Sequence, residues 1–448
     1  MRLSQQFIQA RQPLALFFEL AMVFVWSAAL LMTAAFAQAV PARLSLTEAI
    51  EQARRQSPLL AAAKQRLAIF EAERLEASLR PNPSFNLSGE NFPLDPPEGG
   101  FQFTRTIDWF ATFTHTIETG NKRALRTAVA ERNLASVQIE IAALERQLVY
   151  EVKAAYQKVA FERLRMALLQ ENLTNLEQLV QLTAARVKEG YTAEGDLIKT
   201  RLETQRFGYQ LRNAAIEYDQ AKIKLLRAVG AESFESDALN FELADDLETQ
   251  PVSYTASTLQ EAALRQPQVM LAQSHVEAAR ATLQLEQARV RPDWQVTAGY
   301  KRNGLDNALY GALSIPLPLF NKNQGMLARA EASIAVAEAE LRYARSLVLA
   351  DLAIARRTLV AREQQLEALR ASFLQQADEA RNVALAAYRE GASDLLVLLD
   401  AQRTRSQSQE LYFQALYDHQ LAVHELERVA GIDRLPVRSN AIQTSTEK

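Results

Sequence analysis

The stretch that interrupts this helical chain reads "LRPNPSFNLSGENF" and covers residues 79–92. The 448 residues include only 14 glycines and 14 prolines, a composition that favours long helices. Within the stretch, the apolar residues Phe85 and Leu87 alternate with polar neighbours, which is the period of a strand. A second interruption, "VRPDWQVTAGYKR" at residues 290–302, repeats the pattern. The sequence therefore predicts a mainly α protein with a small β part.

Each interruption is followed by a run that pairs back. Residues 108–117 ("DWFATFTHTI") and 309–315 alternate in the same way, so we expect four strands of roughly ten residues with one apolar face and aromatic ends. These are the dimensions of transmembrane barrel strands, although two hairpins packed on a helical domain would show the same pattern. Four strands cannot close a barrel, and an open sheet would leave unpaired edges. Two chains would supply eight strands and three chains twelve.

The chain also contains an internal duplication. Residues 46–60 ("LTEAIEQARRQSPLL") resemble residues 259–271 ("LQEAALRQPQVML"). Residues 185–201 ("ARVKEGYTAEGDLIKTR") match residues 386–403 ("AAYREGASDLLVLLDAQR"). Repeats of this length predict two copies of one structural unit. The expected organisation is a first repeat at 38–230 (helix, β-hairpin, long helical hairpin), an equatorial segment at 231–256, a second repeat at 257–430 and a C-terminal tail at 431–448.

Each repeat is predicted to contain one very long helix that folds back as a hairpin. Apolar residues step by three and four along residues 134–148 and again along 327–348, as in an antiparallel coiled-coil seam. Both seams then take an extra step of four, which changes the supercoil locally. The first long helix, residues 122–188, would run for about 100 Å at about 1.5 Å per residue. A glycine cap would end each long helix, at Glu189-Gly190 and at Glu390-Gly391.

The N-terminus is expected to be a secretory signal. Arg2 and Arg11 precede an apolar run at residues 20–36, and "AFA" at 35–37 offers a small-x-small cleavage site. This pattern predicts removal of residues 1–37 as a signal peptide. An uncleaved membrane anchor is the alternative, because the run approaches the length that spans a bilayer. No later run reaches that length, so any further membrane contact would not be made by a helix.

Composition argues against several kinds of chemistry. The chain has no cysteine, which rules out disulfides, thiolate metal sites and a cysteine nucleophile. Its formal net charge of −3 does not indicate a nucleic-acid partner, which a strongly basic chain would suggest. The four histidines are too few and too scattered for a metal or acid-base centre. We therefore expect no catalytic residues, no metal site and no cofactor, and a cargo metal ion would be conducted without tight binding.

Taken together, these features make the chain resemble the outer-membrane efflux factors, the TolC-like family, over essentially its whole mature length. The resemblance is carried by the two strand entries quoted above, by "HTIETGNKRALR" (115–126), by "SIPLPLFNKNQGMLARAEA" (314–332) and by the paired Glu-Gly tips. The motifs "IETGNKR" and "IPLPLFNKNQG" are most similar to those of the cobalt-zinc-cadmium resistance branch, with other efflux branches as alternatives.

The resemblance implies a fold, a location and partners. It implies a homotrimer in the outer membrane of a Gram-negative bacterium, with a twelve-stranded transmembrane barrel in contact with lipid. A long helical barrel would continue from it into the periplasm. The implied partners are a periplasmic adaptor (a membrane fusion protein) and an inner-membrane transporter of the resistance-nodulation-division (RND) type. The tip residues Glu189, Gly190, Glu390 and Gly391 would contact the adaptor.

The resemblance also implies a periplasmic gate. In the family the tips close through polar links between the two repeats. The gate tyrosine falls on Tyr388, the carboxylate that it meets falls on Asp196, and a further acidic position of the constriction falls on Asp400. The plainer interpretation is that Asp196 caps a helix and that Tyr388 packs.

The sequence departs from the family's gate pattern at two positions. Ser393 stands where an arginine is expected, and Val397 stands where another aspartate is expected. A closed state would therefore use Arg389 or a weaker network.

The function predicted from the sequence is that of a non-enzymatic exit duct of a tripartite efflux pump. It would passively conduct substrates, with heavy-metal cations among the candidates, from periplasm to exterior. A drug-efflux duct or a type I secretion duct fits the same pattern. From a different class, a periplasmic coiled-coil adaptor or structural protein would share the helical hairpins, but an adaptor should show a single hairpin. An enzyme is disfavoured, because no polar cluster converges in the sequence.

Overall fold

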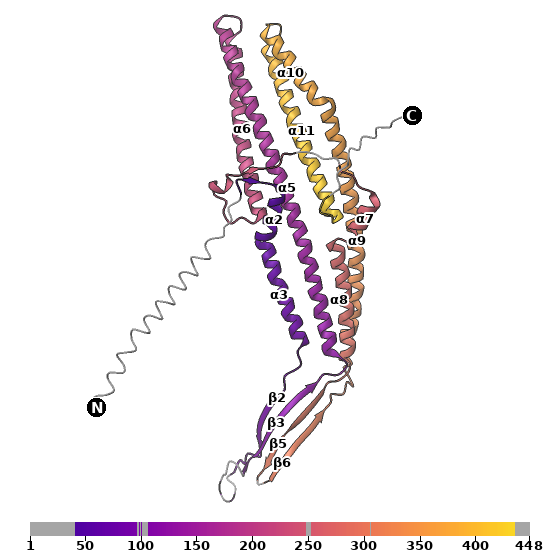
Figure 1. Ribbon diagram of the computed structural model, residues 1–448. Coiled ribbons are helices and arrows are strands. Elements are labelled where there is room, and N and C mark those ends of the chain that lie inside the picture. Colours follow the sequence, from indigo (N-terminus) through magenta and orange to yellow (C-terminus); the bar gives the residue numbers. More distant parts are fainter. Residues whose placement is uncertain are drawn as a thin grey trace, which may run out of the picture. The chain divides into compact units, whose positions relative to one another are not determined.

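The computed structural model describes residues 41–95, 98, 100, 106–247, 252–304 and 306–434 (Figure 1). The chain divides into two compact units. The smaller unit is formed by residues 41–57 and 158–247, and the larger unit by residues 58–157 and 252–434. The predicted signal peptide at 1–37 lies outside the described residues, as does the predicted tail after residue 434.

The smaller unit is a helical hairpin with short elements packed at its open end. The two long helices of the hairpin are linked by an ion pair between Arg165 and Glu217, at 2.6 Å. The short helix α2 packs on α6 and is capped by Ser45, which forms a capping box with Glu48. The elements are β1 (Arg43–Leu44), α2 (Leu46–Gln56), the second half of α5 (Lys122–Lys188), α6 (Glu194–Val229), η1 (Ser236–Leu239) and β4 (Glu242–Leu243), with β1 and β4 parallel.

A buried lysine fastens the segment that follows α6. Lys222 Nζ donates to the carbonyl of Leu239 at 2.9 Å and lies 4.6 Å and 5.0 Å from the ring centres of Tyr218 and Phe241. Burial lowers the pKa of Lys222, against the opposing effect of nearby Asp219 and Glu242. The lysine thus holds η1 against the end of the hairpin.

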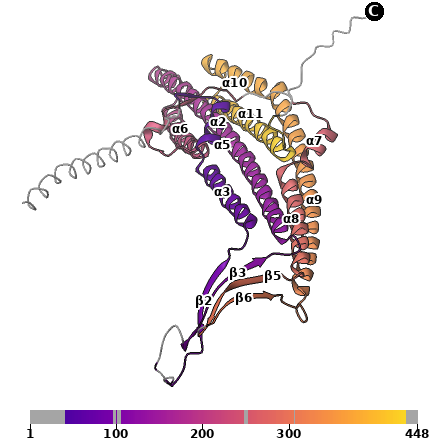
Figure 2. The ribbon, with the colours of Figure 1, turned by 60° about the horizontal axis from the view of Figure 1, so that its bottom comes forward.

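A curved four-stranded sheet lies at one end of the larger unit, beyond the ends of α3, α8 and α9 (Figures 1 and 2). Its strands are β2 (Ser84–Glu90), β3 (Asp108–Ile117), β5 (Trp294–Asn303) and β6 (Asp306–Ser314). All neighbours are antiparallel, in the order β2-β3-β5-β6, so that one hairpin from each repeat joins the same sheet. Within the described residues, β2 and β6 are the edges and each pairs on one side only.

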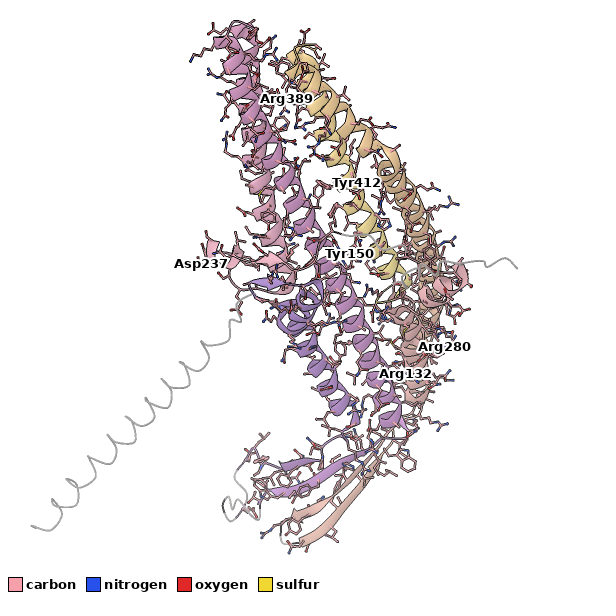
Figure 3. All side chains as sticks on the ribbon, turned by 45° about the horizontal axis from the view of Figure 1, so that its top comes forward. Arg132, Tyr150, Asp237, Arg280, Arg389 and Tyr412 are labelled. Carbon is pink, nitrogen blue, oxygen red and sulfur yellow. The ribbon has the colours of Figure 1, made fainter. Side chains whose placement is uncertain are left out.

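In the larger unit, α7, α8 and α11 pack against α9. An apolar core joins α7, α9 and α11, with Leu359 and Leu426 fully buried. Surface ion pairs link α8 to its neighbours, Arg132 to Glu277 on one side and Arg280 to Glu338 on the other, both at 2.7 Å (Figure 3 labels the arginines). The elements are α3 (Pro58–Ser78), the first half of α5, α7 (Ala256–Ala263), α8 (Pro267–Arg289), α9 (Gln324–Ala368), the π-helical η2 (Leu369–Phe373), α10 (Leu374–Arg389) and α11 (Leu395–Ala430).

The predicted coiled-coil seam of the second repeat is confirmed. Ala330, Ala337 and Ala344 are buried at intervals of seven residues, and the extra step of four from Val348 to Leu352 is buried too. Alanines at such positions let neighbouring helices approach closely. No helix in the described parts of the chain combines the length and the apolar character needed to cross a bilayer.

The structure contains helix breaks that the sequence pattern does not predict. In place of one helix before each pair of strands there are two, and the second helix of each pair begins at a proline, Pro58 or Pro267. Proline lacks a backbone N–H and suits the first turn of a helix but not its interior. The long helix of the second repeat is also interrupted, by the π-helical turn Leu369–Phe373.

Candidate functional site

The sheet of the larger unit has one apolar face, as the alternation predicts. The register places Phe113 of β3 beside Phe85 of β2 and Ala298 of β5, and carries the same face on to β6. Most bulky residues of this apolar face are exposed in the single chain, whereas Trp109 is half-buried. The exposed residues are Phe85, Leu87, Phe113, Ile117, Trp294, Val296, Tyr300, Leu309 and Leu313.

The height of this apolar face fits a membrane. Strand β5 has 10 residues. At about 3.3 Å per residue and a tilt of about 45°, such a strand crosses about 23 Å, close to the apolar band of about 25 Å in outer-membrane barrels. The apolar face is thus suited to lipid.

The opposite, polar face carries hydroxyl groups and one aromatic cluster. Thr114 and Thr297 share a hydrogen bond between their hydroxyls at 2.9 Å. Lys301 Nζ lies 4.7 Å from the centre of the Phe110 ring, which meets Tyr310 edge-on with centroids 6.0 Å apart. The sequence analysis did not single out this cluster, because the register that brings β3, β5 and β6 together was needed to find it.

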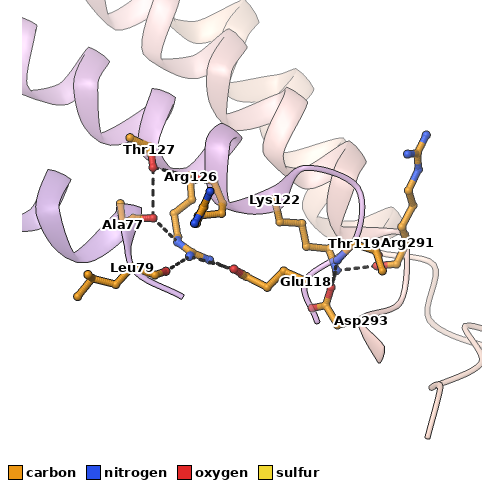
Figure 4. A network of polar contacts seen from close by, with 10 residues as sticks. Ala77, Leu79, Glu118, Thr119, Lys122, Arg126, Thr127, Arg291 and Asp293 are labelled. Carbon is orange, nitrogen blue, oxygen red and sulfur yellow. Dashed lines mark hydrogen bonds and ion pairs between the residues drawn. The ribbon is translucent and has the colours of Figure 1, made fainter. Parts of the chain in front are cut away.

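Arg126 joins the end of α3 to the start of α5 (Figure 4). Its guanidinium donates to the backbone carbonyls of Ala77 and Leu79, both at 3.0 Å, and to Glu118 at 2.7 Å. The last carbonyls of a helix have no partner within the helix, so Arg126 acts as a side-chain cap for α3. Its contacts with Ala77 and Leu79, drawn in Figure 4, lie where the chain leaves α3 toward β2.

A second polar contact fixes the junction between α8 and β5 (Figure 4). Lys122 is only 8% exposed, and its Nζ donates to the Arg291 carbonyl at 2.6 Å and to Asp293 at 2.7 Å. The backbone N–H of Thr119 also donates to Asp293, at 2.9 Å. The motif "IETGNKRALR" therefore places its charged residues where strand β3 becomes helix α5, and the structure adds their partners at the α3–β2 and α8–β5 junctions, which the motif alone did not name.

Both predicted hairpin tips have the expected glycine caps. Gly190 has φ +80° and Gly391 has φ +75°, which is the left-handed region that glycine adopts without strain. The N–H of each glycine donates to a carbonyl three residues back, at 3.0 Å and 3.1 Å. Glu189 and Glu390, which precede the glycines, are exposed, and Arg389 lies at the far end of the α10–α11 hairpin (Figure 3).

The predicted gate residues have defined positions within their own units. Asp196 lies in the first turn of α6 and pairs with Lys199 at 3.4 Å. It is not the helix cap of the plainer interpretation, because the N-cap position is Ala193. Tyr388 is 3% exposed in the last turn of α10, whereas Arg389 and Asp400 are exposed. Asp196 belongs to the smaller unit and the other three to the larger unit, so the gate itself stays a prediction.

A buried polar cluster holds the C-terminal end of α11 against α5. Lys153 Nζ donates to Glu427 at 2.8 Å and to the Asp433 carbonyl at 2.9 Å. The Nδ1–H of His424 donates to the same Glu427 oxygen at 3.0 Å, while its Nε2 lies 3.4 Å from the side-chain amide of Gln157. Burial would raise the pKa of Glu427, but the contacts with His424 and Lys153 outweigh it and lower that pKa.

His419 is a second buried histidine of α11. Burial lowers its pKa, and the charge of nearby His424 lowers it further. Its Nδ1 has no hydrogen-bond partner among the described residues. The sequence analysis set the histidines aside for their spacing, but the interval of three between His424 and Glu427 was a signal that they share a helix face.

The comparisons with known proteins agree on one family. The sequence model described as outer membrane efflux protein matches residues 49–231 and 258–432. The chain is 27% identical over 374 residues to the cobalt-zinc-cadmium resistance protein CzcC of Cupriavidus metallidurans, covering 79% of this chain and 88% of that protein. It is 28% identical over 307 residues to the nickel-cobalt-cadmium resistance protein NccC of Alcaligenes xylosoxydans xylosoxydans, covering 68% and 67%.

Solved structures share the fold. A membrane protein from Pseudomonas aeruginosa superposes with a TM-score of 0.74 at 19% identity, covering 89% of this chain and 92% of its own. The outer membrane protein VceC from Vibrio cholerae gives a TM-score of 0.69 at 19% identity, covering 86% and 96%.

Proposed function

The chain belongs to the outer membrane efflux protein family, and from this premise we propose that it is the exit duct of a pump that exports divalent metal cations. Members of the family are outer-membrane channels that extend into the periplasm, and they are not enzymes. They form trimers in tripartite pumps with an adaptor and an inner-membrane transporter. The observation that carries the cargo proposal is the match to metal-resistance proteins over 68% to 79% of this chain.

The polar face of the sheet supports passage of a cation without capture. Its hydroxyl-bearing residues include Thr112, Thr114 and Thr297. Transition-metal cations such as Zn²⁺ and Ni²⁺ prefer imidazole or thiolate ligands, so neutral hydroxyl oxygens would bind them only weakly. A conducting path must release what it binds, and a hydroxyl-lined wall meets that requirement.

The two open edges of the sheet support a homotrimer. If β6 of one copy paired with β2 of the next, three copies would close a barrel of twelve strands and leave no edge. The helical part offers a matching surface on α6, where large apolar residues are exposed at steps of four and seven. They are Ile198, Leu202, Tyr209, Ile216 and Ile223. Light scattering on the detergent-extracted protein should give three times the chain mass, and a monomer would refute the assembly.

The tips and the gate complete the proposal. We assign the exposed turns at Glu189-Gly190 and Glu390-Gly391 to contact with a periplasmic adaptor, which would connect the duct to an RND-type transporter. The closed state would bring Asp196 to Tyr388, with Arg389 and Asp400 in the same constriction. The proposed mature chain begins after residue 37 and contains repeats at 38–230 and 257–430, joined at 231–256.

Deletion of the coding gene in its own host tests the cargo. We expect the minimal inhibitory concentrations of Co²⁺, Zn²⁺, Cd²⁺ and Ni²⁺ to fall and to recover when the wild-type chain is supplied. Tolerance to a panel of antibiotics should not change. A fall in antibiotic tolerance alone would instead indicate a drug duct, and retention of a secreted protein would indicate a secretion duct.

A further inference from the structure

A basic residue lies exposed at each of the four junctions between helix and strand in the larger unit. Arg80 lies between α3 and β2, Arg123 follows β3 at the start of α5, Arg291 lies between α8 and β5, and Lys322 lies between β6 and α9. We call these four residues the junction cations. Among the described residues, none of their side chains forms an ion pair or hydrogen bond. Figure 4 shows Arg291 pointing away from the polar contacts around it.

The carboxylates nearby are already occupied by other cations. Glu118 is held by Arg126, and Asp293 is held by Lys122, each at 2.7 Å. Glu286, at the end of α8, pairs with Arg289 at 2.6 Å. The junction cations thus form a local positive charge in a chain whose formal net charge is −3.

On the strand side of each junction the exposed residues become apolar. Phe85 follows Arg80, Ile117 precedes Arg123, and Trp294 follows Arg291, all on the apolar face of the sheet. The linker before Lys322 exposes Leu317, Leu319 and Phe320, the last at 93%.

That linker differs from its counterpart in the first repeat. Residues 118–121 are polar, and Glu118 and Thr119 are bonded to Arg126 and Asp293. Residues 315–320 present bulky apolar side chains to their surroundings instead. Because this apolar surface continues the lipid-facing side of the sheet, we expect it to contact membrane lipid as well.

The order from apolar to cationic matches the order of layers in a leaflet. Hydrocarbon gives way to phosphate headgroups at the boundary with water, and Trp, Phe, Lys and Arg gather at that level. Long basic side chains extend from the apolar layer to the headgroups, and anionic lipids attract clusters of them. We propose that the junction cations bind the phosphate headgroups of the periplasmic leaflet, with a preference for anionic phospholipid, and thereby set the depth of the sheet in the outer membrane.

The two tryptophans that follow the predicted signal make this testable. Trp294 starts β5 next to Arg291, and Trp109 lies at the opposite end of the β3–β5 pair, where it faces Arg302. The full mature chain is placed in phosphatidylcholine vesicles that contain brominated phosphatidylglycerol or brominated phosphatidylcholine, which quench tryptophan on contact. A W109F variant reports Trp294 and a W294F variant reports Trp109.

We expect Trp294 to be quenched with at least about a threefold preference for phosphatidylglycerol, and Trp109 to show none. The preference should vanish when all four junction cations are replaced by glutamine, and it should survive the charge-preserving set R80K, R123K, R291K and K322R. A matched control replaces four exposed and unpaired cations on α3 and α9 by glutamine, at Lys64, Arg342, Arg345 and Arg357, and should keep the preference. Equal preference at both tryptophans, or persistence of the preference in the junction glutamine variant, would overturn the proposal.

Discussion

Replacing Lys153 by methionine should weaken the attachment of the end of α11 by about 3 kcal/mol. The pair that Lys153 forms with Glu427 is buried, with side chains 12% and 5% exposed. Removing one partner of such a pair costs about 3–5 kcal/mol, because the other charge stays buried without compensation. His424 still donates to Glu427 in the variant, so the lower end of the range applies. A methionine side chain is similar in length to that of lysine and fills the space that Lys153 occupies.

Hydrogen–deuterium exchange of the detergent-extracted protein measures this effect. The backbone amides of residues 419–430 exchange when the end of α11 opens, and a loss of about 3 kcal/mol speeds that exchange roughly 100-fold. Amides of α6, which belongs to the other unit, provide the internal control and should keep their rates.

A double variant separates the buried charge from the loss of contacts. Lys153→Met combined with Glu427→Met removes both charges, and apolar replacement of a whole buried pair is often neutral or stabilising. Exchange in the double variant should therefore return most of the way to the wild-type rate. Equal rates in wild type and in the single variant would refute the claim that this pair holds α11.

Three further predictions concern the sheet, a histidine and the tips. Gly299→Ala should greatly lower the yield of assembled protein, because its Cβ would lie 2.3 Å from a backbone oxygen of β3, whereas Gly311→Ala, with nothing within 4 Å, should leave the yield on seminative gels unchanged. The lowered pKa of His419 means that the folded state resists protonation of this side chain. Wild-type thermal stability should therefore be constant above about pH 6.5 and fall below it. His419→Phe should reduce this fall in stability with decreasing pH. Tyr388→Phe with Asp196→Ala should raise single-channel conductance in a planar bilayer, and unchanged conductance would remove the case for the gate.

Local patterns predicted most of the fold. The ends of α5 at Lys122 and Lys188 follow from turn signals on either side, and Gly120 and Gly190 both have positive φ. The faces of β3 and β5 follow from their period of two, which needs no knowledge of the neighbouring strand.

Contacts between distant segments were not predictable in this way. Lys153 and Glu427 are 274 positions apart, and the sequence around each residue does not indicate that the two pair. The pairing of Lys122 with Asp293 likewise depends on the two β-hairpins lying side by side in one sheet. The candidate gate is the extreme case, because Asp196 and Tyr388 come from different units and only the resemblance relates them.

The two long hairpins differ in regularity although their sequences are similar. α5 runs through 67 residues without a break, whereas the corresponding run in the second repeat passes through the π-helical turn Leu369–Phe373. A π turn widens the helix by one residue and is a common origin of a kink. We therefore expect the first hairpin to stay straight and the second to bend at its π-helical turn. A ring of three chains would contain six similar hairpins, and only the three from the second repeats would bend. The periplasmic end would then open with threefold rather than sixfold symmetry.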